Sequence, residues 1–449
     1  MHSRRRSFGK NHGEHVKAAA GVGVEQVAYR VAAQRDARAV GHRAVGPQHG
    51  GHRVEHGVAS CPLVRQVGVE RRRGRVDEIL KNGSQRSRHG QTLDTDGRRG
   101  ASEARGPTLR RRAGLRGARP GENRLARVIK PLALAHLPTP LEPADRLGAA
   151  LGLEAGRLFV KRDDCTGLAG GGNKARKLNY LCADALAQGA DVLVTGGGRQ
   201  SNHVRMTIAA ANRLGVGATV VMSSDEPARP SGNVVLDHLL APDFVWAGPL
   251  KYYPLEERIA EVCDELRARG RLPYRIPIGG ATPVGALGYI DAADEILEQL
   301  GALPSLAITA NGSGGTHAGL VAGFGDHARV LGVDVGTRPD LDDVVPREAS
   351  AAAALAARSE PVGEVQVDHD HFGADYGAPT DAARHALHLF ATREGLLLDP
   401  VYTGKAAAAL VTYARDERLP DGPIVFMHTG GVPALFTNTF SEWVKTRPS

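Results

Sequence analysis

From Leu137 onward, short apolar runs alternate with amphipathic segments, and this alternation restricts the fold more than any other feature of the chain. In residues 178–186 the apolar positions follow the i, i+3, i+4, i+7, i+8 spacing of a helix with one buried stripe. Strands joined by helices form a largely parallel sheet with both faces covered, and ligands bind at the carboxyl ends of its strands. The sequence therefore predicts an α/β fold. The predicted strands are 157–163, 191–195, 218–222, 243–247, 274–278, 305–310, 329–335 and 423–429, and the clearest helices are 201–215 and 254–269.

Two glycine-rich segments follow predicted strands and precede predicted helices. In GGGRQSNH (196–203), Ser201 or Asn202 is a candidate helix cap, and the free N–H groups of that helix would hold a carboxylate. In NGSGGTHAG (311–319), small residues and two hydroxyls suit a phosphate at a helix N-terminus. The second segment lacks the Gly-Lys-Ser/Thr ending of a Walker A loop and the GxGxxG spacing of a dinucleotide loop. A purely structural connection remains the alternative for both segments.

A lysine stands at the start of a predicted helix, directly after a run of glycines. Lys174 follows Gly170–Gly172, where the backbone can turn tightly and allow a bulky group to approach. Taken alone, this lysine is either a solvated residue or a nucleophile. Together with a phosphate-binding loop it suggests pyridoxal 5′-phosphate, because the amine can form a Schiff base with the aldehyde while the ring withdraws electrons. A further cluster, DPVYTGK (399–405), precedes an alanine-rich helix and adds a tyrosine and a threonine.

The charge of the chain is unevenly distributed. The overall formal charge is +8, but residues 1–125 hold 27 Lys and Arg against 11 Asp and Glu, whereas residues 126–449 hold 30 against 38. The first segment contains two aromatic residues and shows no sustained helix or strand period, which is typical of a chain that does not pack a core. We interpret residues 1–125 as a basic extension that is either disordered or translated from upstream of the real start, near Val128. A nucleic-acid-binding arm is the functional alternative.

The cysteine pattern and the hydropathy exclude several classes of protein. The chain has four cysteines and no CxxC pair, so neither a zinc site nor a disulfide framework is indicated, and a reducing cytoplasm fits. No run of about 18 apolar residues is present, which argues against a membrane span. The sequence therefore indicates a cytoplasmic protein with no structural metal.

Residues 130–440 resemble the D-cysteine desulfhydrase and 1-aminocyclopropane-1-carboxylate deaminase family of fold type II pyridoxal-phosphate enzymes. The resemblance implies a tryptophan-synthase-β-like architecture of two open, twisted, mostly parallel sheets with helices on both faces. It further implies a large cofactor-binding domain (126–177 and 278–449), a small α/β domain (178–277) and a homodimer that binds no nucleic acid. The motifs that carry it are, in order, LPTPLEP, KRDD, GGNKARKL, QSNH, GALGY, GSGGTHAGL, YGAPT, LLLDPVYTGK and HTGGVPALF.

The resemblance also implies roles for individual residues. Lys174 would form the Schiff base, and Asn202 would contact the ring hydroxyl of the cofactor. The substrate would be held by Ser201 and the neighbouring backbone, with Asn202 and His203 beside it. The remaining implied residues are the phosphate-binding Gly312, Ser313, Gly314, Gly315 and Thr316, the substrate-facing Tyr376 and Tyr402, and Thr403 at the pyridine nitrogen.

The position of Thr403 separates two reactions within this family. The deaminases carry glutamate there, which keeps the pyridine protonated for opening a cyclopropane ring, whereas the desulfhydrases carry threonine. The resemblance therefore implies a lyase that converts a small amino acid, D-cysteine, to pyruvate, ammonia and hydrogen sulfide. The deaminase and an L-cysteate sulfo-lyase are the enzymatic alternatives. Arg199 and the Ala281-Thr282 pair depart from the usual family pattern at positions expected near the substrate.

Overall fold

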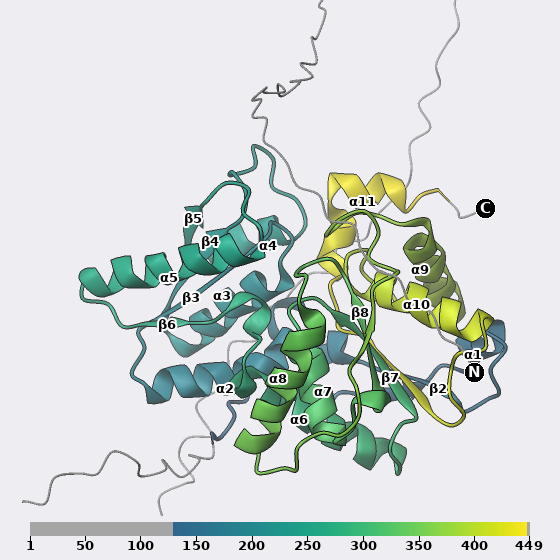
Figure 1. Cartoon of the computed structure of the whole chain (residues 1–449). Coiled ribbons are helices and arrows are strands. Elements are labelled where there is room, and N and C mark those ends of the chain that lie inside the picture. Colours follow the sequence, from purple (N-terminus) through teal and green to yellow (C-terminus); the bar gives the residue numbers. More distant parts are fainter. Residues whose placement is uncertain (1–128, 447–449) are drawn as a thin grey trace, which may run out of the picture. The chain divides into compact units, whose positions relative to one another are not determined.

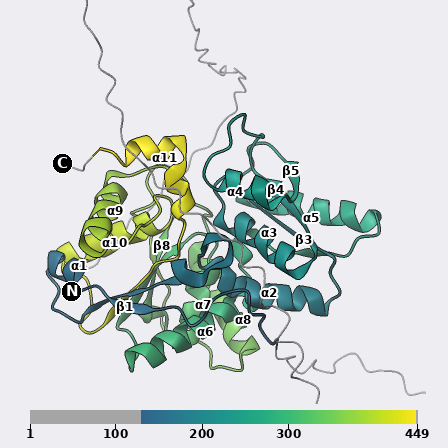
Figure 2. The ribbon, with the colours of Figure 1, turned by 180° about the vertical axis from the view of Figure 1, so that it is seen from behind.

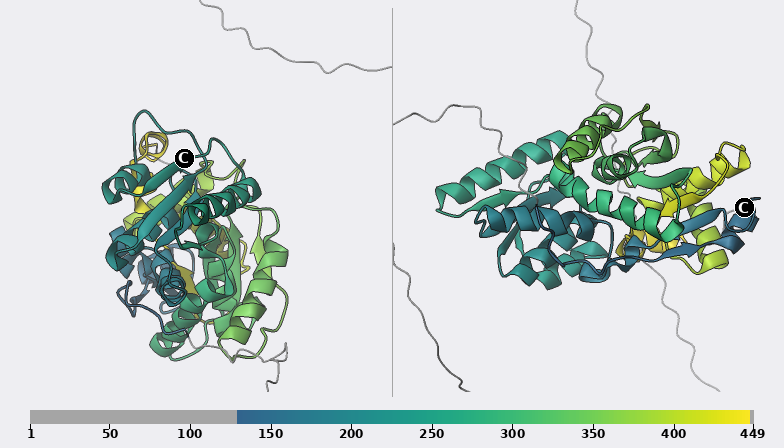
Figure 3. Two further views of the ribbon diagram at one scale, coloured as in Figure 1. Left: turned by 90° about the vertical axis from the view of Figure 1, so that its left-hand side faces the viewer. Right: turned by 90° about the horizontal axis from the view of Figure 1, so that it is seen from below.

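Two mainly parallel sheets organise the described residues of this computed structural model, 129–446 (Figure 1). A six-stranded sheet has the order β1-β2-β10-β7-β8-β9, and a four-stranded sheet has the order β5-β4-β3-β6. Every pairing is parallel except that of β1 with β2. The two sheets lie side by side (Figure 3). The strands are β1 (Leu141–Pro143), β2 (Leu158–Lys161), β3 (Val192–Gly197), β4 (Gly217–Met222), β5 (Asp243–Trp246), β6 (Pro273–Arg275), β7 (Leu306–Asn311), β8 (Val330–Asp334), β9 (Gln366–Asp368) and β10 (Ile424–Met427).

Eleven α-helices of the described residues connect or flank these strands. The connections between the parallel strands of each sheet are mostly helical, as the alternation in the sequence predicts. The helices are α1 (Asp145–Ala150), α2 (Lys174–Ala187), α3 (Asn202–Leu214), α4 (Asn233–Leu240), α5 (Tyr252–Ala268), α6 (Pro283–Leu300), α7 (Gly315–Phe324), α8 (Leu341–Leu355), α9 (Asp381–Glu394), α10 (Thr403–Arg415) and α11 (Asn438–Trp443). None of the helices in the described range is long and apolar enough to cross a membrane.

Helices cover both faces of each sheet, as Figures 1 and 2 show from opposite sides. In β3, Leu193 packs with α2 and α3, whereas its neighbours Val192 and Val194 pack with α5. In the larger sheet, Phe426 packs toward α9 and α10, and Val425 packs toward α6 and α7. Successive side chains of a strand point to opposite faces, so each strand needs apolar residues at consecutive positions. This explains why the predicted strands are continuous apolar runs.

The predicted helix 201–215 is confirmed together with its ends. The Ser201 side chain caps α3 by accepting a hydrogen bond from Val204 N at 3.2 Å, and Gly215 ends the helix in the left-handed conformation with φ 70°. In α2 the predicted stripe is buried except at its last position, since Leu186 is 41% exposed.

The prediction of two domains stays a prediction. The described residues all belong to one compact unit by their internal contacts, although all strands of the smaller sheet lie between residues 192 and 275. The predicted basic extension, residues 1–125, lies outside the described residues.

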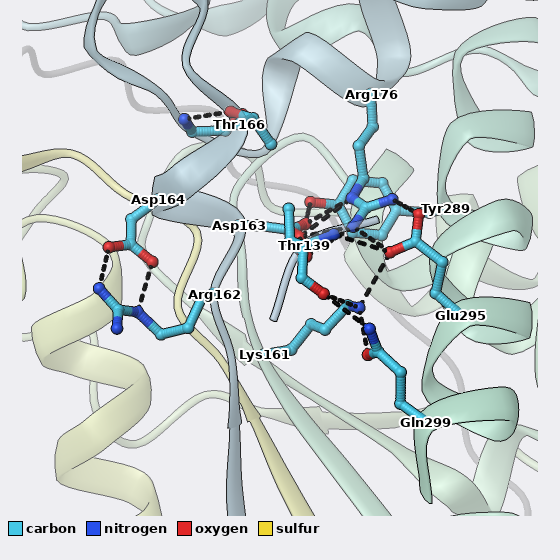
Figure 4. A network of polar contacts seen from close by, with 11 residues as sticks. Thr139, Lys161, Arg162, Asp163, Asp164, Thr166, Arg176, Tyr289, Glu295 and Gln299 are labelled. Carbon is cyan, nitrogen blue, oxygen red and sulfur yellow. Dashed lines mark hydrogen bonds and ion pairs between the residues drawn. The ribbon is translucent and has the colours of Figure 1, made fainter. Parts of the chain in front are cut away.

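A buried network of polar side chains fixes the first turn of α2 (Figure 4). The guanidinium of Arg176 bonds both carboxylate oxygens of Asp163 and both of Glu295, at 2.8–3.0 Å. Tyr289 Oη also donates to Asp163, and Lys161 Nζ lies 2.9 Å from a Glu295 oxygen. Burial alone would raise the pKa of Asp163, but the Arg176 charge and these hydrogen bonds hold it below its usual value. The network joins β2, α2 and α6 around the helix that begins at Lys174.

Two further ionisable side chains are buried between α3 and α4, Arg205 and Asp237, and we expect Asp237 to make the stability of the fold depend on pH. Both carboxylate oxygens of Asp237 are buried without a hydrogen-bond partner among the described residues, and Arg205 is also fully buried. Burial raises the pKa of Asp237 to about 7, although the Arg205 charge acts to lower it. A carboxyl whose pKa is raised by folding favours the protonated folded state, so stability falls as the pH rises from about 4 to about 7.

We expect Asp237→Asn to remove this dependence. A shift of about three pKa units corresponds to at most about 4 kcal/mol, and relaxation reduces it. The variant should therefore gain about 1–3 kcal/mol of unfolding free energy over the wild type between pH 5 and pH 8. Chemical unfolding at the two pH values checks this, with Asp243→Asn on the exposed start of β5 as control. If the difference in unfolding free energy between the variant and the wild type were the same at both pH values, the pKa of Asp237 would not be raised by folding.

Candidate active site

A pocket lies between the two sheets, where β3, β7 and β10 end. The carboxyl ends of parallel strands open toward the same side, so the loops that follow them come together. The pocket contains most of the residues predicted from the sequence and no carboxylate among its described lining residues. Its predicted members are Lys174, Ser201, Asn202, His203, Gly312, Ser313, Gly314, Thr316 and Tyr402, and the members that sequence reasoning missed include Asn173, Thr337, Thr429 and Gly430.

Lys174 is the first residue of α2 and projects into this pocket. The glycine run before it has positive φ at Gly170, Gly171 and Gly172, and a Cβ at Gly171 would lie 1.9 Å from a backbone oxygen. Only glycine therefore allows the turn that brings the lysine to the pocket. Burial lowers the pKa of Lys174 to about 8, although the Asp399 charge acts to raise it. A substantial fraction of this amine is neutral near pH 8, which a nucleophile requires.

The loop between β7 and α7 lines the same pocket as Lys174, and we call it the anion cradle because a helix N-terminus of this kind suits an anion. Gly314 precedes α7 with φ 92°, and the first backbone N–H groups of the helix have no side-chain cap. Asn173 Nδ2 donates to Thr316 Oγ1 at 3.0 Å, so the glycine run and the cradle are tied together. Gly315 does not line the pocket directly, because its Cα faces Ala281 and the Lys177 amine.

Lys177 is a further candidate for phosphate binding that the sequence reasoning did not identify. Its buried Nζ donates to Gly279 O at 3.1 Å and lies 2.9 Å from the position that a Cβ on Gly315 would occupy. Burial, followed by the charge of Lys174, lowers its pKa well below the usual value. An ammonium beside a helix N-terminus and a second lysine needs an anion to be stable as a charge. The spacing of one helical turn from Lys174 is the signal that would have found it.

The N-terminus of α3 forms the second wall of the pocket. Ser201 and Asn202 begin the helix, and the backbone N–H groups of Asn202 and His203, unlike that of Val204, are not used by the Ser201 cap and can serve a carboxylate. His203 is buried, and its Nε2 lies 3.0 Å from Thr195 Oγ1, which donates to Ile276 O. Burial and the two nearby lysines lower the pKa of His203 well below its usual value, so this imidazole is neutral. This wall can bind a carboxylate without contributing a negative charge.

Two tyrosines meet at the open side of the pocket. The hydroxyls of Tyr376 and Tyr402 share a hydrogen bond, with the ring centroids 6.0 Å apart in an edge-on arrangement. Tyr402 lines the pocket, whereas Tyr376 lies in the segment before α9 and is 36% exposed. Burial, together with the neighbouring hydroxyl, raises the pKa of Tyr402 well above its usual value. Tyr402 therefore keeps its proton at neutral pH.

Thr403 is predicted to contact the pyridine nitrogen of the cofactor, so it is expected to line the pocket. It is not among the described lining residues. It is the first residue of α10, not a loop residue, and its hydroxyl donates to Asp399 Oδ1 at 2.7 Å. Asp399 also accepts hydrogen bonds from the backbone of residues 401–403. Thr429, from the HTGG motif after β10, lines the pocket instead. The predicted contact of Thr403 with a pyridine nitrogen stays a prediction.

The two departures from the family pattern lie outside this pocket. Thr282 caps α6 by accepting a hydrogen bond from Gly285 N at 3.1 Å, and Ala281 packs behind Gly315. Arg199 lines a second pocket on the far side of Tyr376, together with Arg229. Neither arginine forms an ion pair within the described part of the chain, and no acidic side chain is among the residues lining this second pocket.

The residues present fit pyridoxal 5′-phosphate. The cradle at α7 and the buried Lys177 suit its phosphate, and the Lys174 amine faces the same space where an aldehyde would lie. A dianion bound there would favour the charged forms of Lys174 and Lys177, whose pKa values burial lowers.

Comparisons with known proteins agree with this fit. The model of the family described as "Pyridoxal-phosphate dependent enzyme" matches residues 132–430. A D-cysteine desulfhydrase of Klebsiella pneumoniae (strain 342) is 42% identical over 318 residues, which are 68% of this chain and 95% of that protein. A D-cysteine desulfhydrase of Salmonella paratyphi C (strain RKS4594) is 40% identical over 319 residues, with the same coverage of both chains.

Two solved structures share the fold. The crystal structure of an ACC deaminase homologue superimposes with a TM-score of 0.65 and 34% sequence identity, covering 71% of this chain and 96% of the other. The processed form of threonine deaminase isoform 2 from Solanum lycopersicum has a TM-score of 0.51 and 17% identity, covering 69% and 83%. The first structure agrees with the family resemblance in the sequence, and the second supports the fold alone.

Proposed function

Because this chain belongs to the pyridoxal-phosphate dependent enzyme family, we propose that it is a D-cysteine desulfhydrase, a lyase that converts D-cysteine and water to pyruvate, ammonia and hydrogen sulfide. The observation that carries the proposal is the position of Lys174 beside an anion cradle in a pocket without carboxylates. The names of the relatives support the substrate, and the threonine at position 403 agrees with them.

The cofactor supplies an electron sink that acidifies the hydrogen on the α-carbon of the amino acid. The residues of this chain provide the remaining functions. The Lys174 amine, with a pKa of about 8, is suited to accept that proton near neutral pH. The N-terminus of α3, with Ser201 and Asn202, is suited to bind the substrate carboxylate and so to orient the Cα–H bond toward Lys174.

The tyrosine pair is placed to act on the leaving sulfur. When the Cβ–S bond breaks, the electron pair stays on sulfur, which leaves as a thiolate or takes up a proton. Tyr402 Oη holds a proton at neutral pH because burial raises its pKa, and the hydrogen bond to Tyr376 fixes its orientation. In this proposal Tyr402 donates to the departing sulfur, and Tyr376 positions Tyr402.

The deaminase alternative is disfavoured by the residue at position 403. Thr403 brings no negative charge to stabilise a protonated pyridine, and the nearby Asp399 carboxylate is occupied by Thr403 and three backbone N–H groups. Opening a cyclopropane ring needs strong electron withdrawal because no leaving group assists, whereas cysteine expels a thiolate. The pocket is therefore better suited to elimination.

A second candidate, an L-cysteate sulfo-lyase, is favoured by one observation. Arg199 and Arg229 line the pocket beyond Tyr376 with no acidic side chain beside them in its described lining. Arginine binds oxyanions through paired N–H donors, so a sulfonate on Cβ would find its complement there. The elimination would then release sulfite in place of hydrogen sulfide.

A comparison of kcat/KM for three substrates tests the proposal. We expect pyruvate and sulfide from D-cysteine, with kcat/KM about 10²-fold or more above that for 1-aminocyclopropane-1-carboxylate. Product assays for pyruvate, sulfide, sulfite and 2-oxobutanoate distinguish the three reactions. Arg199→Gln serves as the variant and Arg213→Gln, at the far end of α3, as the matched control.

Each outcome of this comparison has a distinct meaning. Efficient ring opening by the wild type would refute the argument from Thr403. A dominant activity on L-cysteate that falls about tenfold or more in Arg199→Gln, the value of one charge-assisted hydrogen bond, would keep the elimination but replace the substrate.

The proposal includes three finer expectations. A reducing cytoplasm agrees with the free Cys165, Cys182 and Cys263, and a homodimer acting on a small amino acid agrees with the family resemblance. The basic arm of residues 1–125 has no part in the proposed reaction. The alternative of a nucleic-acid-binding protein with an inactive enzyme fold predicts no turnover in the comparison above.

A further inference from the structure

The amide oxygen of Asn202 is fully used by two donors behind the pocket wall. Arg205 Nη1 donates to Asn202 Oδ1 at 2.8 Å, and Asn233 Nδ2 donates to the same oxygen at 2.9 Å. An amide oxygen accepts about two hydrogen bonds, so this pair saturates it. The Asn202 Nδ2 group forms no hydrogen bond with any described residue, and Asn202 lines the pocket.

The assignment of nitrogen and oxygen in these amides follows from the donors themselves. A guanidinium has no acceptor, so the atoms that face Arg205 must be oxygens. Arg205 bonds Oδ1 of both asparagines, which leaves Asn233 Nδ2 to donate to Asn202 and, at 2.9 Å, to Gln200 O. Rotating either amide by 180° would place N–H groups against the guanidinium.

The same arginine reaches the loop that presents the lysine. Arg205 Nη2 donates to Gly171 O at 3.0 Å, within the glycine run that precedes Lys174. Both Arg205 and Asn233 are fully buried. Asn233 is the first residue of α4 and is also held through its backbone N–H, which donates to Gln200 Oε1 at 2.8 Å. Arg205 and Asn233 are therefore themselves held in place by contacts with the glycine run, with Gln200 and with Asn202.

We propose that Arg205 and Asn233 are positioning residues that fix the Asn202 amide with its N–H groups toward the pocket, as a donor to the ring oxygen of the cofactor. The proposal deepens the proposed function, because it relies on the cofactor lying in this pocket with its ring hydroxyl near Asn202. Neither residue touches the cofactor. Both disfavour the alternative orientation of Asn202. In that orientation the amide oxygen would face the deprotonated ring oxygen of the cofactor and repel it.

The physical consequence is a preorganised donor. A hydrogen bond to an anionic ring oxygen is charge-assisted and favours the deprotonated oxygen over the protonated form. If Asn202 rotated freely, forming this hydrogen bond would cost the conformational entropy of the side chain, and part of the stabilisation would be lost. Cofactor affinity and the pH dependence of its visible absorption should therefore both depend on Asn233, which lies outside the pocket lining.

A double-mutant cycle on Asn202 and Asn233 tests this. Asn233→Asp keeps the size and the acceptor for Arg205 but removes both N–H donors, and Asn202→Ala removes the donor to the cofactor. We expect each single variant to weaken cofactor binding about tenfold, the value of one charge-assisted hydrogen bond, and to shift the pH titration of the visible band in the same direction. The double variant should be no weaker than the worse single variant within about twofold, because both changes remove one interaction.

The controls separate positioning from a general structural effect. Asn212→Ala removes another amide contact between α3 and α4, the bond to Leu240 O at 2.8 Å, far along the helix from the pocket. It should leave the cofactor dissociation constant and the visible band unchanged. If Asn233→Asp does not fold, Asn233→Ser is the second variant. Serine keeps a smaller donor, so this variant should retain part of the cofactor affinity.

Two results would overturn the proposal. Wild-type affinity and spectrum in both Asn233 variants would show that Arg205 alone orients Asn202. Effects that multiply in the double variant would show that Asn233 acts independently of Asn202. Neither result depends on which amino acid is the substrate, because binding and absorption are measured without one. If the enzyme did not turn over D-cysteine, the proposed function would be wrong, but the proposed positioning of Asn202 by Arg205 and Asn233 would be unaffected.

Discussion

Lys174→Ala is expected to lower turnover of D-cysteine by about 10³-fold or more, because one change removes the group that we propose as both covalent anchor and proton acceptor. The described lining of the pocket contains one amine that could perform both functions. Lys174 is the only lysine among the described residues lining the pocket, and this lining contains no carboxylate that could replace it as a base. Steady-state assays of pyruvate formation measure the loss.

The matched control is Lys177→Ala, one turn further along the same helix. Its amine lies against the anion cradle, so this variant should weaken cofactor binding and regain much of its activity at high cofactor concentration. Lys174→Ala should not be rescued in this way. Comparable turnover in Lys174→Ala and the wild type would mean that another group performs the chemistry.

Arg176→Met is expected to destabilise the fold by about 3–5 kcal/mol, the usual cost of leaving buried carboxylates without their cation. Asp163 is fully buried, the Glu295 side chain is 15% exposed, and Arg176 provides hydrogen bonds to all four of their carboxylate oxygens (Figure 4). Methionine fills a similar volume but donates nothing. The unfolding free energy of the cofactor-free protein, measured by urea titration, shows the effect.

Arg162→Met provides the comparison within the same figure. Arg162 pairs with Asp164 (Figure 4) and with Glu142 near the surface, and 20% of its side chain is exposed. Exposed pairs contribute about 0–1 kcal/mol, so this variant should remain close to the wild type. If Arg176→Met does not accumulate, Arg176→Lys retains one charge and should fall between the two. Equal, small losses in both methionine variants would contradict the account of the network.

The central strands β3, β4, β7, β8 and β10 were predictable because they are buried on both faces. Residues such as Val192, Leu193 and Val194 are all apolar, so the run is visible without any knowledge of the partners. The three-residue edge strands β1 and β9 gave no such signal. Strand β9 has three residues, Gln366–Asp368, and forms only because β8 offers an open edge. Leu186 continues a helical stripe in the sequence, but nothing packs over it.

The site was predictable where its residues follow strands and was missed where tertiary packing selects them. Ser201 stands in a glycine-rich segment directly after β3, Lys174 follows a glycine run at the start of α2, and the structure brings both to one pocket. Asn233 belongs to a helix about 30 residues away from Asn202 in sequence, and only the packing of α4 on α3 brings them together. Arg229 likewise joins Arg199 only through the fold.

We propose that Lys174 carries the cofactor, and the most direct test identifies which lysine is linked to it. Borohydride reduction of the wild-type enzyme makes the bond between cofactor and amine permanent, and peptide mass spectrometry then locates it. Four lysines of the described residues are buried or line the pocket: Lys161, Lys174, Lys177 and Lys405. The account predicts the label on Lys174 and none in Lys174→Ala. A label on Lys177, Lys161 or Lys405 in the wild type would contradict it.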